Sequence, residues 1–185
     1  MEKLPTLAEL HHDVSAAFKN DQLNALLNQP PHQAWLKKHP MTKGDYLPID
    51  KVEWLLTRIF QEWKVEIISY SQLFQSIAVH LRLHYKNPIT GEWQFHDGVG
   101  ASPIQTDAGK SAADLSAIKT SAVQIALPSA ESYALKDAAE KLGTLFGKDL
   151  NRKDTVMFAG AYSPTPESNG TANKQSSQPF NTEAL

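Results

Sequence analysis

The sequence predicts an α+β protein with a β-β-β-α core, an antiparallel three-stranded sheet packed on a helix that is long or broken by a proline. Three observations predict this fold. An amphipathic helical pattern occupies residues 51–60, a period-two pattern follows between 63 and 96, and Ala- and Leu-rich helical patterns return from 112 to 146. A helical arm is expected before this core and a polar tail after it.

The predicted arm occupies residues 1–42. Thr6 and Glu9 have the spacing of a capping box, and apolar residues then recur at helical spacing. Asp21 is placed to cap a short second helix, which a Pro-Pro pair ends. Residues 33–38 have the pattern of one more helical turn.

The core begins with the clearest helix of the chain. Pro48-Ile49-Asp50 is the start signal, and apolar residues follow at i, i+3, i+4, i+7 and i+8: Val52, Leu55, Leu56, Ile59 and Phe60. This spacing places all five on one face, which we expect to be buried.

Three strands are predicted next. Residues 63–68 alternate imperfectly, whereas 73–85 place apolar side chains on one face and Ala78, His80, Arg82 and His84 on the other. A turn at 86–91 leads to a third strand at 92–96, which the glycine-rich stretch 98–101 ends.

The last helical region is predicted in two parts. Residues 112–127 are helical by composition, and Pro128 breaks or restarts the helix because proline is tolerated only in a first turn. An apolar stripe then runs from Leu135 to Phe146. Beyond about Gly160 the chain is too polar to offset its ordering entropy and is predicted to be disordered. The expected division is therefore arm 1–42, core 43–153 and tail 154–185.

Composition narrows the class of protein. The chain has 185 residues, 41% of them hydrophobic and 21% charged, as in ordinary globular proteins. It has no cysteine, which fits a reducing cytoplasm, and neither a signal peptide nor a membrane-spanning stretch is visible. We therefore expect a cytoplasmic or nucleoid-associated protein without a membrane partner.

Charge is distributed unevenly along the chain. Residues 36–153 carry fifteen basic and thirteen acidic side chains, while both flanking segments are acidic. The core is thus near +2, which permits a nucleic-acid partner but indicates one only weakly.

Signatures of catalysis are missing from the sequence. His80 and His84 would lie roughly 13 Å apart on a strand, too far to share one metal ion. Gly109-Lys110-Ser111 resembles the end of a phosphate-binding loop, but Ile104 stands where that loop requires glycine. We expect no enzyme, no metal and no cofactor.

Basic residues near helix ends and on the polar strand face remain for function. They are Arg82, Lys136, Lys141, Lys148, Arg152 and Lys153. From this pattern alone, a solvated sheet face and cations that suit helix dipoles are favoured over DNA binding.

Three motifs in order resemble the amino-terminal domain of the Rad52/22 recombination family, most closely its short bacterial and phage members, which include the DNA-damage-response protein of radiation-resistant bacteria. They are Tyr46-Leu47-Pro48, then Thr90-Gly91-Glu92-Trp93 leading into Gly98-Val99-Gly100-Ala101, and then Leu127 to Arg152. The resemblance covers about residues 43–153.

This resemblance implies subunits that assemble into a homo-oligomeric ring. A basic groove round the ring is expected to hold single-stranded DNA by its backbone, so that a complementary strand can anneal to the exposed bases without ATP. Lys136 matches the family's groove lysine, Lys43 and Tyr46 match positions lining the same groove, and Arg82 matches an arginine on a hairpin strand.

The sequence departs from the family pattern after Lys136. Asp137 and Glu140 stand where eukaryotic members carry arginines, so other cations are expected to compensate: Lys148, Arg152 and Lys153, with Lys110, Lys119 and Lys141 as further candidates. The alternatives are a ring that protects DNA ends without annealing efficiently, or a metal-dependent nuclease. A single-strand-binding protein or an exonuclease is a candidate partner. For the tail, an inert end is favoured over docking of a partner such as a single-strand-binding protein through Phe180.

Overall fold

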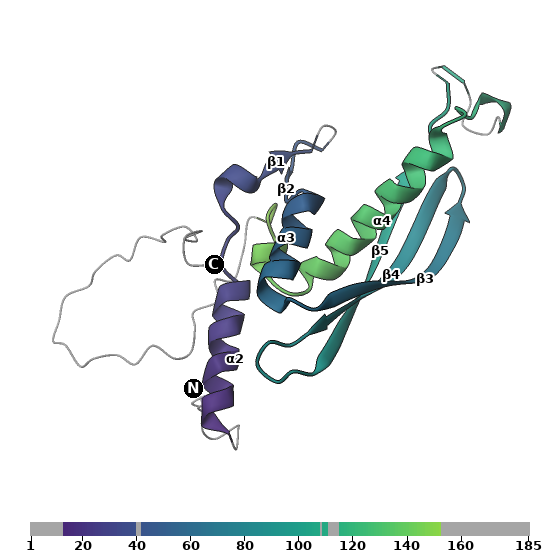
Figure 1. Cartoon of the computed structure of the whole chain (residues 1–185). Helices are drawn as coiled ribbons and strands as arrows, with labels where there is room; N and C mark the ends of the chain where they lie inside the picture. The colour runs from purple at the N-terminus through teal and green to yellow at the C-terminus, as the bar shows by residue number, and fades with distance from the viewer. Residues whose placement is uncertain (1–12, 40–41, 108, 111–114, 153–185) are drawn as a thin grey trace, which may run out of the picture. The chain divides into compact units, whose positions relative to one another are not determined.

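A computed structural model describes residues 13–39, 42–107, 109–110 and 115–152 (Figure 1). The chain divides into two compact units. The first contains residues up to Leu47 and the chain from Gly143 onward, and the second is Pro48–Leu142. The predicted capping box at Thr6 and Glu9, Lys153 and the tail lie outside the described residues.

The first unit is built on one helix, α2 (Val14–Leu27). Asp13 caps it, because its carboxylate accepts a hydrogen bond from the Ala16 amide at 2.9 Å. The prediction that Asp21 starts a second helix is wrong, because Asp21 lies inside α2, whose N-terminal cap is Asp13.

The remainder of the first unit is made of short elements. Of the predicted turn at 33–38 only the 3₁₀ helix η1 (Gln33–Trp35) forms. Strand β1 (Lys37–Lys38) pairs with β2 (Asp45–Tyr46), and the chain returns to this unit as the 3₁₀ helix η3 (Thr144–Phe146). These elements position the turn at Lys43.

In the second unit, helix α3 (Ile49–Phe60) confirms the clearest sequence prediction. It follows Pro48 directly, and all five of its predicted apolar residues are buried. Its last ring, Phe60, packs against Tyr85 of the sheet with centroids 4.8 Å apart.

The sheet has the antiparallel order β3-β4-β5, formed by β3 (Trp63–Leu73), β4 (Ser76–Lys86) and β5 (Trp93–Pro103). Four alternate side chains of β4 are buried: Val79, Leu81, Leu83 and Tyr85. Helix α4 (Ala122–Glu140) lies along the sheet against β4 and β5 (Figure 1). This is the predicted β-β-β-α core.

The third strand is longer than the sequence pattern indicated. Gly98 and Gly100 do not end β5 but lie within it, opposite Leu81 and Val79 of β4. A Cβ at Gly98 would collide with the backbone of Ala134 and Ala138 on α4. The glycines therefore admit the helix backbone onto the strand, a role that glycine can have inside a strand.

Helix α4 also differs from the prediction. Residues 115–121 form only the 3₁₀ helix η2 (Leu115–Ala117) and a turn, so the helix predicted from residue 112 begins at Ala122. Pro128 neither breaks nor restarts it, because this proline is on the exposed side, where a lost backbone hydrogen bond can be replaced by water. The predicted stripe from 135 to 146 is divided, since α4 ends at Glu140.

Candidate nucleic-acid interface

Lys136 and Tyr133 lie one turn apart on α4. The Lys136 ammonium is 5.4 Å from the centre of the Tyr133 ring, and the ring is 42% exposed. Burial lowers the pKa of Lys136, whereas the carboxylates of Glu140 and Asp50 act in the opposite direction. The arrangement is a half-buried cation beside an accessible ring, which suits contact with both a phosphate and a base.

Asp137, the next residue, points to the sheet. Its carboxylate accepts a hydrogen bond from the Val99 amide of β5 at 3.0 Å and pairs with Lys141 at 3.2 Å. Lys141 in turn donates to the backbone carbonyl of Asp97. These contacts attach the end of α4 to the edge of β5, so the charge of Lys141 is partly neutralised.

Arg82 is held by Asp97 across the β4–β5 pair. The guanidinium donates to both carboxylate oxygens, at 2.6 and 3.0 Å, and lies 4.2 Å from the centre of the Phe95 ring. The hydrogen bond from Arg82 lowers the pKa of Asp97 to about 2, and the same bond raises the pKa of Arg82. A phosphate at Arg82 would have to compete with this bidentate pair.

His80 and His84 lie on β4, as the alternation predicted, each facing a different acid. His80 is 3.6 Å from the Asp97 carboxylate, and His84 is 2.9 Å from that of Glu66, whose pKa is lowered by this hydrogen bond. Within the described residues, no cluster of three or more His, Asp or Glu side chains is arranged to hold a metal ion.

Lys110 and Lys119 belong to the segment that joins β5 to α4. Both are exposed. The Lys110 amide donates to the Asp107 carbonyl, and the Lys119 amide donates to the Gln105 carbonyl. Each of these hydrogen bonds fixes the backbone of one lysine. Their side chains can turn toward solvent or a ligand.

The first unit brings a second set of candidates together. The side chain of Asn151 bonds both the amide and the carbonyl of Asp45 at 2.8 Å, which holds the chain around Lys148 and Arg152 against β2. Arg152 pairs with Asp149 at 2.9 Å, whereas Lys148 makes no ion pair with any described residue.

Lys43 and Tyr46 flank Asp45, the residue that Asn151 contacts, in the sequence. Tyr46 is in β2, half-buried, with its ring centre 6.1 Å from that of His39. Lys43 is exposed in the β1–β2 turn, where its backbone has a φ of 60°. The predicted residues at 43, 46, 148 and 152 thus share one unit, and those at 82, 110, 119, 136 and 141 share the other.

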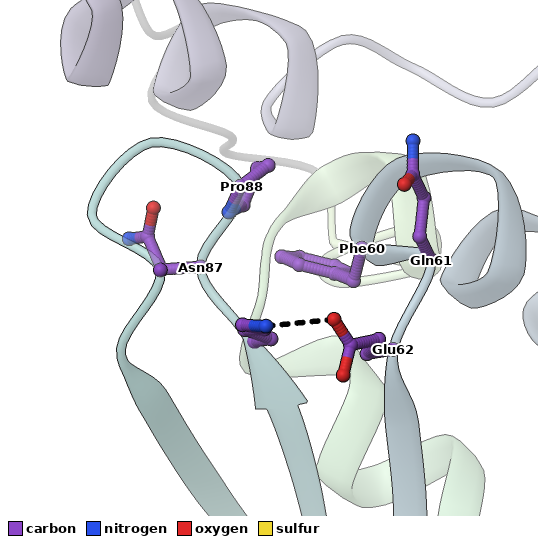
Figure 2. Close-up of a pocket in the computed structure, with 7 residues that line it drawn as sticks. Phe60, Gln61, Glu62, Asn87 and Pro88 are labelled. Carbon is purple, nitrogen blue, oxygen red and sulfur yellow. Dashed lines mark hydrogen bonds and ion pairs between the residues drawn. The ribbon is translucent and has the colours of Figure 1, made fainter.

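A cavity of about 230 Å³ lies between the end of α3 and the β4–β5 turn (Figure 2). Phe60 and Pro88 contribute its apolar surface, and the ion pair between Glu62 and Lys86, at 2.7 Å, lies on its rim. This volume is below the range of about 300–1,000 Å³ usual for small-molecule sites, and the charges of Glu62 and Lys86 are already paired with each other.

Comparison with known families gives one match. Residues 19–168 match the family described as Rad52/22 family double-strand break repair protein. The chain belongs to the Rad52/22 family. No curated protein matches the sequence. The match spans most of the chain, including the sheet and all of α4.

Membership of the Rad52/22 family places the chain among proteins of DNA recombination and repair. Their general activities are DNA binding, single-strand annealing and oligomerisation, and they are generally not enzymes. No described helix is long and apolar enough to span a membrane.

Sequence reasoning missed two features of this site. The spacing of Asp137 and Lys141 predicts their ion pair, which the structure confirms, but the hydrogen bond by which the Asp137 carboxylate joins α4 to β5 was not expected. Trp93, Phe95 and Asp97 share one strand face, of which the predicted strand 92–96 contained only the two rings, because the glycines were interpreted as the end of the strand. The alternation from Trp93 to Val99 was the signal that could have revealed it.

Proposed function

We propose that this chain is a single-strand DNA annealing protein that needs no ATP and acts as a homo-oligomeric ring in homologous recombination or double-strand break repair. The Rad52/22 match over residues 19–168 carries this proposal. We further propose that the protein is encoded by a phage or prophage and acts at the nucleoid in the bacterial cytoplasm.

Within this proposal, residues 43–153 form the DNA-binding core. The proposed contacts are Lys43, Tyr46, Arg82, Lys110, Lys119, Lys136, Lys141, Lys148, Arg152 and Lys153. Lys136 is the principal contact, since it is half-buried on a rigid helix next to an accessible ring. Arg82 and Lys141 contribute less, because both already bond Asp97 or Asp137.

The chemistry of annealing fits such contacts. Lysine and arginine bind phosphates without regard to sequence, so any single strand can be held by its backbone. Neutralising the backbone reduces repulsion between complementary strands, and pairing is then favourable by itself. No covalent bond is made or broken, so neither ATP nor a catalytic group is required.

Annealing is tested by mixing labelled complementary oligonucleotides with the protein in the absence of ATP and divalent metal. The proposal expects faster duplex formation than in the uncatalysed reaction. Single-strand binding without acceleration would leave only protection of DNA ends. Loss of strand that a chelator abolishes would indicate a nuclease instead.

Lys136→Ala tests the principal contact. Each phosphate contact contributes about 0.7 to the slope of log K against log salt for a single strand, so the variant should bind more weakly with a slope reduced by about that amount per subunit engaged. Lys19→Ala is the matched control, because Lys19 is an exposed lysine on α2 outside the proposed site. An unchanged slope in Lys136→Ala would assign Lys136 a structural role only.

Oligomerisation is tested separately. Negative-stain images of the full chain, with and without oligonucleotide, are expected to contain closed rings. A chain shortened by residues 160–185 should form the same rings, because the proposed core is complete without them. Monomers after this deletion would contradict the division between core and tail.

A further inference from the structure

The face of the sheet turned away from α4 carries exposed aromatic residues. On β5, Trp93 is 50% exposed and Phe95 is 53% exposed, and Val99 on the same face is 64% exposed. Their register partners on β4 are Lys86, His84 and His80. The buried side chains of β4 alternate with these and lie on the α4 side, so the second unit itself leaves this face open.

A cation accompanies each ring. The Lys64 ammonium of β3 lies 5.5 Å from the centre of the Trp93 ring, and the Arg82 guanidinium lies 4.2 Å from the centre of the Phe95 ring. Lys64 is exposed and forms no ion pair within 4 Å with any residue that the structure describes, although its charge contributes to the lowered pKa of Glu66. An ammonium held over a ring in this way can also contact a phosphate that lies beside that ring.

The charges around the rings limit what this face can bind. Arg82 is neutralised by Asp97, and His84 is bonded to Glu66, so the face as a whole is not strongly basic. It is therefore unsuited to holding a DNA backbone by charge alone. Charged side chains also separate the exposed rings. The centre of a protein–protein interface is depleted of charge, so this face does not have the composition of a protein-docking surface.

We propose that Trp93 and Phe95 form a stacking surface for unpaired bases of single-stranded DNA, distinct from the phosphate contacts on α4. Residues two apart on a strand are spaced by roughly 7 Å on one face, so neighbouring rings can each accept a base. Lys64 supplies a cation for a phosphate beside the first ring. Alternating rings and cations of this kind are used in sequence-tolerant single-strand binding.

Stacking would complement the proposed annealing function, on which this inference rests. A base that stacks on a ring keeps its hydrogen-bonding edge accessible, so a complementary base can still pair with it. Because the contact involves the base and not the phosphate, its contribution to affinity should change little with salt. That property separates the stacking surface from the Lys136 site, whose contribution falls steeply with salt.

The test uses the full chain with two probes of equal length, oligo(dT) and the same backbone without bases. The variant is Trp93→Leu with Phe95→Leu, which keeps apolar bulk on the strand but removes the rings. Phe74→Ala is the matched control, since Phe74 is an almost fully exposed ring at the β3–β4 turn. Circular dichroism and sedimentation verify the fold and the assembly of each variant.

The wild type is expected to prefer oligo(dT) over the abasic probe, and the double variant to lose about tenfold or more of that preference with an unchanged salt slope. Phe74→Ala should retain the preference. A preference that survives in the double variant would overturn the proposal. So would an altered assembly state with the preference intact, because the face would then contact another copy. If Lys136→Ala leaves the salt slope unchanged while the double variant loses base preference, the α4 assignment fails and the stacking surface stands.

Discussion

The carboxylate of Asp137 on α4 accepts a hydrogen bond from the backbone amide of Val99 on β5, at 3.0 Å. Strand β5 is at the edge of the sheet, and edge amides are without a strand partner on one side. Asp137 and Lys141 together bond two backbone groups of this edge, the Val99 amide and the Asp97 carbonyl. Asp137, an acidic residue where the family pattern is basic, thus has a structural role, because it attaches the helix that carries Lys136 to the sheet.

Asp137→Ala should therefore lower the free energy of unfolding by about 0.5–1.5 kcal/mol, the usual net value of one hydrogen bond. Asp137→Asn should lose less, because its amide oxygen can still accept from Val99. Urea denaturation at one fixed protein concentration measures both. If Asp137→Ala were neutral for stability and instead tightened DNA binding, its role would be electrostatic repulsion and not attachment of the helix.

Gly100→Ala should be strongly destabilising. Its Cβ would meet the backbone of Ala130 and Ala134, and neither strand nor helix backbone can move without separating the sheet from α4. We expect a loss of about 1–3 kcal/mol or more, the range for overpacked cores, measured by thermal unfolding. Gly91→Asn is the control, since a Cβ there meets nothing within 4 Å and Asn tolerates the positive φ. Equal effects of the two changes would refute close packing at Gly100.

Asp97 should make the fold sensitive to acid. Its pKa is about 2 in the folded chain, mainly because Arg82 donates hydrogen bonds to it, and near 3.9 when unfolded. The lower folded value means that this stabilisation is complete above about pH 4 and is lost as the pH falls toward 2. Urea midpoints measured between pH 5 and 2.5 should therefore decline.

In Asp97→Asn this part of the decline should be absent, because no carboxylate remains to be protonated. The pKa of Glu66 is also lowered, by its hydrogen bond to His84, so some acid dependence will remain in the variant. Midpoints that fall equally in both proteins would show that Asp97 does not contribute to the acid response.

DNA binding should weaken at alkaline pH earlier than the ordinary pKa of lysine would suggest. Burial lowers the pKa of Lys136, so the side chain loses its charge as the pH rises through that lowered value. Single-strand affinity measured between pH 7 and 10 is expected to fall. In Lys136→Arg the fall should be smaller, because arginine stays protonated over this range. Identical pH profiles would exclude Lys136 as the titrating contact.

Local patterns were sufficient to predict most of the elements. The five apolar residues of α3 and the alternation along β4 gave the right buried faces, because side-chain period depends on backbone geometry alone. Boundaries were less predictable. Gly98, Gly100 and Pro128 are common at the ends of elements, yet all three lie inside one, because the packing between α4 and β5 needs small residues and leaves Pro128 exposed.

The candidate site was only partly visible in the sequence. Lys136 was indicated by resemblance, and Glu140 lies one helical turn from it, but its pKa also depends on burial and on Asp50, which only folding brings near it. The pairing of Arg82 with Asp97 joins residues fifteen positions apart and requires the β4–β5 register. A prediction from single positions could not distinguish a paired arginine from an available one.

The sequence by itself determined the β-β-β-α order, the buried helix α3 and the family, since these depend on periodicity and on motifs read along the chain. Only the tertiary structure decided which charges are available. Arg82, Lys141 and Asp137 are engaged within the fold, Lys64 forms no ion pair with the described residues, and Trp93 and Phe95 share an open face. The reason is physical: an ion pair or a ring–cation contact depends on distance in space, which strand register and helix packing set.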